Sequence, residues 1–167
     1  MNILATIGTV DPSLQYADRP TVKVVVKKDD QLIILNEGLL PGGGIDPGES
    51  DQDAIRRELQ EELVITLRDT HEIGTVVQYR ILINKKYLIS GYTAELETTG
   101  GPTNPQDERE ARIITRWLTL DEAMIYVSGS IDKVKLKPMD DADNQSKLYN
   151  LMTTFELLKS LNSKLSQ

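Results

Sequence analysis

The sequence predicts a single α/β domain, and two kinds of apolar pattern support this prediction. Short runs rich in β-branched residues, separated by turn residues, are typical of strands and recur through the first two thirds of the chain. Longer stretches with apolar residues at helical spacing stand between and after these runs. Strands interleaved with helices imply a sheet packed against helices. The length of 167 residues is enough for one sizeable core, and no internal repeat or second domain is visible.

Four runs of apolar and β-branched residues predict two hairpins, formed by residues 21–28 with 31–36 and by residues 73–84 with 86–96. The turn of the first hairpin is expected at Asp29 and Asp30. The turn of the second is expected at Lys85 and Lys86, whose charges suit an exposed position.

A glycine-rich turn at 41–48 and a helix follow the first hairpin. Ser50 is a suitable N-cap for this helix, because its hydroxyl can accept a hydrogen bond from the backbone of Asp53, three residues further on. We therefore expect the helix to begin at about residue 51.

The last predicted strand comes after a long polar stretch. Residues 97–107 contain two glycines and two prolines and predict a loop. Residues 113–118 then read as a strand. Thr119 and Glu122 form a capping box, which predicts a short helix over 120–127.

The C-terminal part of the chain predicts an irregular segment over 128–143 and a long helix over 144–165. Apolar residues recur along this helix at helical spacing, namely Leu148, Leu151, Met152, Phe155, Leu158 and Leu165. Such a stripe either packs on the sheet of the same chain or forms the interface of a homodimer.

Composition excludes several classes of function. The chain has no cysteine, and therefore no disulfide, thiolate zinc site or cysteine nucleophile. The net charge is −7 and no basic patch is apparent, which argues against a nucleic-acid polymer as partner. No secretory signal pattern or stretch of membrane-spanning length is visible, so we expect a cytoplasmic protein without a membrane partner.

Three glutamates of the helix that begins near residue 51 are the most informative residues of the chain. At about 100° per residue, Glu58, Glu61 and Glu62 fall on one face, beside an apolar stripe that can face a core. Carboxylates crowded along one helix edge repel one another. Hard cations between them would offset this repulsion, and Mg²⁺ often shares its oxygen ligands between carboxylates and substrate phosphates. The pattern therefore predicts a metal-bridged phosphate site.

The spacing of these residues resembles the Nudix box, which runs from a glycine through a glutamate to the sequence Arg-Glu-aliphatic-x-Glu-Glu-x-Gly-aliphatic. The matching residues are Gly43, Glu49, Arg57, Glu58, Leu59, Glu61, Glu62 and Ile65. The lead-in at 40–44 is also similar to that family. The chain departs from the pattern at Val64, where the family has glycine in a left-handed conformation. Because a β-branched residue resists positive φ, we expect a different helix end or a slightly longer helix.

The resemblance implies a Nudix fold, with a mixed sheet sandwiched between helices, and covers about residues 22–127. It also implies hydrolysis of a nucleoside diphosphate derivative with Mg²⁺ or Mn²⁺. By position, Glu61 and Glu62 match the family's main metal ligands, and Glu58 matches a ligand or the base toward water. The Gly42 carbonyl would complete the metal sphere, and Arg57 matches an orienting arginine, paired with Glu49.

Four further residues are weaker candidates. Many relatives add a glutamate from a loop before the last strand, and Glu108 and Glu110 stand at about that distance here. Each is a fourth ligand, the general base or a solvated surface residue. Arg80 lies in the middle of a predicted strand and either binds phosphate or faces solvent. Tyr79 either stacks on a base or packs against its neighbours.

The resemblance leaves the substrate open between a nucleoside triphosphate and a nucleotide-sugar-like diphosphate, because marks of other subfamilies are missing. An alternative function is a Nudix domain that senses a nucleotide without cleaving it. Intact carboxylates at the box favour the enzyme. Isopentenyl-diphosphate isomerase activity relies on a catalytic cysteine, which this chain lacks.

Overall fold

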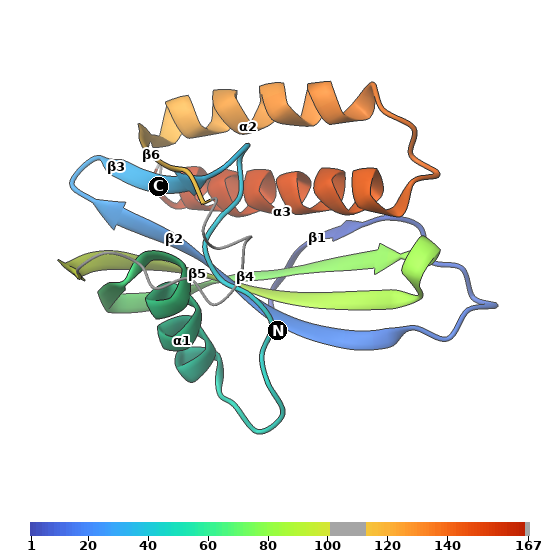
Figure 1. Cartoon of the computed structure of the whole chain (residues 1–167), viewed down its shortest axis with the longest axis horizontal. Coiled ribbons are helices and arrows are strands. Elements are labelled where there is room, and N and C mark those ends of the chain that lie inside the picture. The colour runs from blue at the N-terminus through green and yellow to red at the C-terminus, as the bar shows by residue number, and fades with distance from the viewer. Residues whose placement is uncertain (101–112, 166–167) are drawn as a thin grey trace.

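The computed structural model describes residues 1–100 and 113–165, and its centre is one mixed six-stranded sheet. The strand order is β1-β4-β5-β2-β3-β6. The strands are β1 (Ile3–Ile7), β2 (Ala17–Lys28), β3 (Gln31–Leu35), β4 (Ile65–Arg80), β5 (Lys85–Thr99) and β6 (Thr115–Thr119). The pairs β1–β4 and β2–β5 are parallel, and the other three pairs are antiparallel. Helices cover both faces, so the predicted fold class is confirmed (Figure 1).

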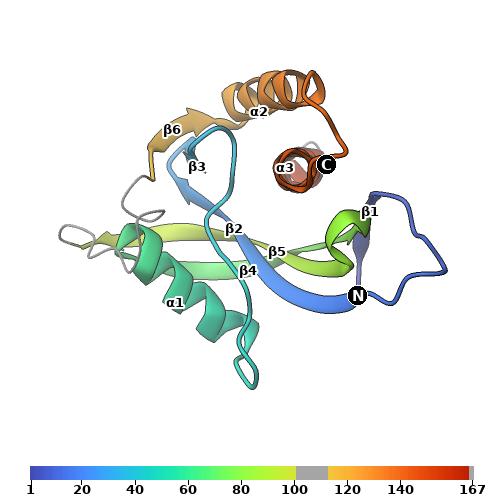
Figure 2. The ribbon, with the colours of Figure 1, turned by 45° about the vertical axis from the view of Figure 1, so that its right-hand side comes forward.

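The helices divide between the two faces of the sheet. Helix α1 (Asp51–Leu63) lies on one side, and α2 (Leu120–Lys135) and α3 (Ala142–Leu165) lie on the other (Figure 2). Alternate residues of β2 show the division, since Val22 and Val24 pack with α1 and Val25 packs with α2 and α3. The part of the chain that the structure describes has no helix of the length and apolarity needed to span a bilayer.

Both predicted hairpins form, but the second turn lies earlier than expected. It consists of a 3₁₀ helix, η1 (Ile81–Ile83), and Asn84 in the left-handed region at φ 51°. The expected turn at Lys85 and Lys86 is therefore wrong, because these lysines begin β5. An apolar Ile-Leu-Ile run is typical of a strand, but here Asn84, which tolerates positive φ, reverses the chain directly after it.

The structure also adds one strand that was not predicted and corrects two predicted boundaries. Strand β1 was not predicted from the sequence, since it is short and only one of its five residues is fully buried. Strand β5 continues to Thr99, so residues 97–99 are not a loop. Helix α2 runs to Lys135 instead of ending at residue 127. The small residues around Gly129 suggested a break, but Ile131 and Val134 continue the buried stripe.

The end of α1 also differs from the expectation. Val64 adopts the left-handed conformation, with φ 52° and ψ 49°, and the helix ends at Leu63. Its backbone N–H donates to Gln60, and its carbonyl accepts a hydrogen bond of 2.6 Å from the N–H of Gly100. These hydrogen bonds hold a valine in the backbone geometry that the Nudix box normally assigns to glycine.

The long C-terminal helix forms as predicted and packs within the chain. Leu157 and Leu158 are fully buried, and Leu148 and Leu151 join the same core cluster as the face of the sheet that α3 covers. The apolar stripe of α3 therefore packs on the sheet, and a homodimer through this helix remains a prediction.

Candidate functional site

The glycine-rich turn is held against β2 by backbone hydrogen bonds. The N–H of Val22 donates to Gly43 at 2.9 Å, and that of Val24 donates to Pro41 at 3.0 Å. The turn thus runs alongside the strand as a short extension of the sheet and leads to the N-terminus of α1, which Ser50 caps as predicted. This pairing fixes the turn beside the carboxylates of α1.

Two glycines of the turn are required by close approaches. Gly42 has φ 114°, and a Cβ there would collide with the carbonyl of Val22. A Cβ on Gly43 would collide with the carboxylate of Glu58. The Glu58 side chain therefore rests directly on the backbone of the turn, which brings a helix carboxylate to the Gly42–Gly43 peptide.

Arg57 holds the helix and the turn together. Its guanidinium donates to both carboxylate oxygens of Glu49, at 2.9 and 2.8 Å, and to the Gly44 carbonyl at 2.8 Å. It also donates to Glu58 at 2.7 Å and lies 3.6 Å from Glu61. The expected pairing of Arg57 with Glu49 is present in this geometry. A guanidinium that binds several acceptors at fixed angles is suited to orient them.

The contact between Arg57 and Glu49 shifts the pKa of both groups. The hydrogen bonds from Arg57, helped by one from the backbone of Asp46, lower the pKa of Glu49 from 4.5 to about 2. The hydrogen bonds that Arg57 donates, above all those to Glu49, raise the pKa of Arg57. Both groups are therefore charged across the whole physiological range.

Lys23, which the sequence did not single out, places its ammonium at the Gly42 carbonyl. Its Nζ donates to that carbonyl and, at 3.0 Å, to the carbonyl of Leu40. The N–H of Gly42 donates in turn to Glu62 at 2.8 Å. Burial lowers the pKa of Lys23, while the negative charges of Glu62 and Glu58 act in the opposite direction. One cation therefore lies among the groups that the resemblance assigns to a metal.

This arrangement fits a hard cation in donor type and in charge. Within residues 1–100 and 113–165, no three His, Cys, Asp or Glu side chains form a ready metal-binding group. However, the Gly42 carbonyl and the carboxylates of Glu58 and Glu62 all supply oxygen, the donor that Mg²⁺ prefers. Four glutamates of the site carry −4, and Arg57 with Lys23 carries +2, which leaves −2. The four are Glu49, Glu58, Glu61 and Glu62.

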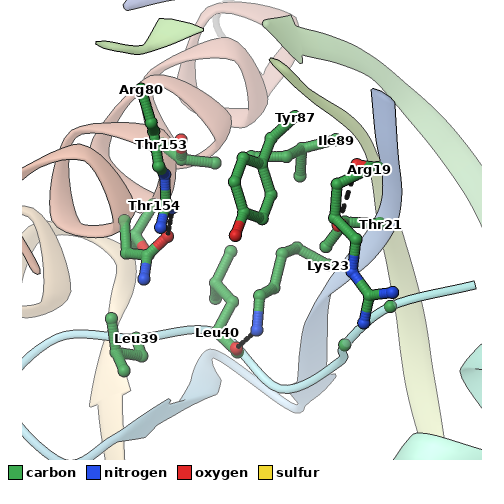
Figure 3. A pocket seen from close by; sticks show the side chains of 13 residues that line it. Arg19, Thr21, Lys23, Leu39, Leu40, Arg80, Tyr87, Ile89, Thr153 and Thr154 are labelled. Atoms are coloured by element: carbon green, nitrogen blue, oxygen red, sulfur yellow. Dashed lines mark hydrogen bonds between the residues drawn. The ribbon is translucent and has the colours of Figure 1, made fainter. Parts of the chain in front are cut away.

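A cavity of about 260 Å³ opens next to the glycine turn, between the sheet and α3. Arg80 lines it and is buried, with 5% of its surface exposed. Its guanidinium donates to Gln78 at 2.8 and 2.6 Å and to Asn150 at 2.6 Å, and it lies 3.9 Å above the ring of Tyr87. Arg80 thus faces the interior rather than solvent (Figure 3).

The remaining candidates lie elsewhere. Tyr79 does not line this cavity and packs edge-on against Tyr16, at 5.2 Å between ring centroids. His71, the single histidine of the chain, is exposed. Glu108 and Glu110 lie outside the described residues, so their roles remain predictions.

Sequence reasoning missed Lys23 and Arg19 for a simple reason. Both occupy alternating positions of β2, where a polar residue is normally read as facing solvent. The signal that was available is the contrast between Lys23 and its neighbours, because it stands between two valines that are fully buried.

Comparison with known proteins identifies the family and the fold. A family model described as "NUDIX domain" matches residues 18–141. A NUDIX hydrolase from Nitrosomonas europaea superposes with a TM-score of 0.56 at 21% identity, over 67% of this chain and 79% of that one. A MutT NUDIX hydrolase from Burkholderia pseudomallei gives a TM-score of 0.52 at 18% identity, over 80% and 98%. A mutator MutT protein from Bacillus halodurans gives 0.51 at 20%, over 80% and 82%.

The structural similarities show the shared fold. A search of curated proteins found no match. Because the family model spans well over half of the sequence, this chain belongs to the NUDIX family.

Proposed function

We propose that this protein hydrolyses the pyrophosphate linkage of a nucleoside diphosphate derivative with the help of Mg²⁺ or Mn²⁺. The observation that carries the proposal is that the Gly42 carbonyl, which accepts from the Lys23 ammonium, lies at a turn that Glu58 and Glu62 also contact. The Gly42 carbonyl and the glutamates Glu58, Glu61 and Glu62 would hold the metal.

A bound divalent cation supplies charge neutralisation on phosphate oxygens and makes a bound water more acidic. The chain's own residues supply the position. Arg57 ties Glu58 to Glu49 and to the Gly44 carbonyl, which fixes the Glu58 carboxylate beside the glycine turn. Glu58 is then placed either to bind the cation or to accept a proton from the attacking water. Arg57 acts as a positioning residue in this proposal.

The experiment that tests the proposal is a hydrolysis panel. The folded protein is incubated with Mg²⁺ and nucleoside triphosphates, ADP-ribose, nucleotide sugars or dinucleoside polyphosphates, and release of phosphate and pyrophosphate is measured. We expect rapid cleavage of one class that stops when the metal is chelated. Glu58→Gln should lower the rate by about 100-fold or more, whereas Glu72→Gln, a matched change at an exposed glutamate of β4, should not.

The competing function is a nucleotide sensor of the same fold. It predicts tight, saturable binding of one member of the panel with no cleavage at any metal concentration. This outcome would replace the enzyme assignment. The intact box carboxylates and their fixed geometry favour hydrolysis.

A further inference from the structure

Among the residues that the structure describes, three positive charges and no carboxylate line the cavity beside the glycine turn. Arg19 and Lys23 come from β2, and Arg80 comes from the end of β4. Figure 3 shows these side chains around one space, with Lys23 reaching down to the glycine turn. Arg19 and Arg80 line the cavity away from the carboxylates of α1, while the Lys23 ammonium lies at the turn itself, where the charges of Glu62 and Glu58 act on it.

Arg80 is the strongest indication that this space binds an anion. Only 5% of its surface is exposed, yet no carboxylate of the described residues forms an ion pair with it. Its contacts are the neutral amide oxygens of Gln78 and Asn150 and the ring of Tyr87. A buried charge without a counter-ion is costly, and burial lowers the pKa of Arg80. A bound anion would supply the missing charge.

A second layer of residues fixes the direction of the Arg80 guanidinium. The amide nitrogen of Gln78 donates to Thr153 at 2.6 Å and to the backbone of Tyr149 at 3.0 Å, both on α3. The amide oxygen of Gln78 is therefore turned toward Arg80 and accepts from its Nε and Nη2. This arrangement positions the guanidinium before any ligand arrives, which reduces the ordering cost of binding.

Arg19 adds an exposed guanidinium at the mouth of the cavity. It lies against the backbone of Gly44, so closely that a Cβ on that residue would collide with it. No carboxylate of the described part of the chain forms an ion pair with Arg19 either. Guanidinium groups are suited to bidentate contact with phosphate, so Arg19 and Arg80 offer donors from two elements.

The cavity is poorly suited to a nucleobase. Within residues 1–100 and 113–165, Tyr87 is the only aromatic side chain that lines it, and the Arg80 guanidinium covers its ring at 3.9 Å. A base would have to displace this contact in order to stack. The volume of about 260 Å³ is also below the range of roughly 300–1,000 Å³ that holds drug-sized ligands. A compact anionic group matches both features.

We propose that this cavity, the Arg19–Lys23–Arg80 pocket, binds a phosphate group of the substrate that lies outside the scissile linkage. The proposal rests on the proposed hydrolase function and sharpens it. It favours a substrate with a chain of three or more phosphates, such as a nucleoside triphosphate. A nucleotide sugar would place a neutral sugar beside three positive charges.

The first test measures phosphate binding without metal. Inorganic phosphate and pyrophosphate are titrated into the full chain in the presence of chelator at constant ionic strength. Binding is measured by calorimetry and by the shift in thermal unfolding. We expect saturable binding that Arg19→Gln weakens about tenfold or more, because a charge-assisted hydrogen bond is lost. Arg80→Lys keeps the positive charge but removes the paired N–H donors of the guanidinium, and it should also weaken binding. Arg68→Gln, an exposed arginine elsewhere on β4, is the matched control.

Arg19 is exposed, so its substitution is not expected to disturb folding. Equal phosphate binding by wild type and Arg19→Gln, or an absence of saturable binding in folded wild type, would overturn the proposal. Neither result decides whether the protein is a hydrolase, which the hydrolysis panel tests separately. Conversely, an absence of cleavage in the panel would not change the phosphate binding measured without metal.

The second test separates a substrate phosphate from a free phosphate ion that binds as an effector. With Mg²⁺ present, Arg19→Gln should raise KM for a nucleoside triphosphate about tenfold and leave KM for ADP-ribose, which has no third phosphate, nearly unchanged. Inorganic phosphate should compete with the triphosphate. Non-competitive inhibition, or equal KM changes for both substrates, would contradict the assignment of this pocket to a substrate phosphate.

Discussion

At the scale of single residues, Lys23 gives the site its unusual electrostatics. Its ammonium bonds to the Gly42 carbonyl, a group that the proposed function assigns to a metal. A lysine in this position neutralises part of the charge of Glu58 and Glu62. It also stabilises the metal-free site, because three carboxylates on one helix edge would otherwise repel one another.

This position leads to a prediction about metal affinity. Lys23→Met should raise the affinity for Mn²⁺ about tenfold or more in the absence of substrate, because it removes a positive charge from the carbonyl that the cation needs. Titration of Mn²⁺, followed by the paramagnetic signal of the free ion, measures this affinity. Lys27→Met is the matched control, since that lysine lies about 13 Å further along β2. Unchanged or weaker binding by Lys23→Met would show that Lys23 does not compete with the metal.

The Glu49–Arg57 pair makes the stability of the protein depend on acid. The pKa of Glu49 is about 2 in the folded chain and 4.5 without its partners. The unfolded chain therefore takes up a proton between these values that the folded chain does not. Stability from this pair is complete above pH 4.5 and is lost as the pH falls toward 2.

Glu49→Gln tests this linkage. The difference in thermal stability between wild type and Glu49→Gln should be largest at neutral pH and should shrink as the pH falls through 4.5 toward 2. Thermal unfolding across this range measures it, with Glu72→Gln as a control at an exposed glutamate. A difference that is constant with pH would contradict the assigned role of Arg57 in lowering the pKa of Glu49.

At the scale of elements, α1 shows how far sequence reasoning reaches. Its start at Asp51, its Ser50 cap and its apolar stripe follow from local patterns that do not depend on the rest of the fold. Its end was mispredicted, because the hydrogen bond from Gly100 to Val64 joins residues that are distant in sequence. The extension of α2 beyond Gly129 was missed because the packing of Ile131 and Val134 outweighs the low helix propensity of the small residues.

The left-handed conformation of Val64 predicts a reversal of the usual order of stability. In most positions glycine is less stable than alanine. Here Val64→Gly should be more stable than Val64→Ala by about 1 kcal/mol, because only glycine adopts positive φ without steric cost. Both variants remove the two γ-methyl groups of Val64 and differ from each other only in the β-carbon, so chemical denaturation of the pair reports mainly the backbone effect. A more stable alanine variant would mean that Val64 is not held in this conformation in solution.

At the scale of the whole molecule, helix α1, which carries carboxylates of the site, and the cavity with its positive side chains lie on opposite faces of the sheet and meet at the glycine turn. Helix α1 covers one face of the sheet and α3 the other (Figure 2). The cavity lined by Arg19, Lys23 and Arg80 lies on the α3 side, since Asn150, Thr153 and Thr154 of α3 also line it. A polyanionic substrate would reach negative groups only through a cation, while its outer phosphate would meet positive side chains directly. This division would allow a protein with a net charge of −7 to bind the phosphate groups of the proposed substrate.

The sequence predicted the carboxylate half of this arrangement, but of the cationic half it singled out only Arg80, as one of two alternatives. The glutamates and Arg57 stand close together in one motif, so their spacing alone is informative. Arg19, Arg80 and Asn150 are far apart in the chain and meet only because β5 lies between β4 and β2 in the sheet while α3 packs over this face. Strand order and helix docking are long-range features that short sequence patterns do not encode.

The most direct test of the central claim compares wild type with Glu62→Gln in the cleavage of a nucleoside triphosphate. The measurement is the initial rate of pyrophosphate or phosphate release with Mg²⁺ and with chelator. We expect metal-dependent turnover in wild type and a loss of about 100-fold or more in Glu62→Gln, with both proteins folded by thermal unfolding. Equal rates in the two proteins, or cleavage that persists without metal, would contradict a hydrolytic centre built on Gly42 and the glutamates of α1.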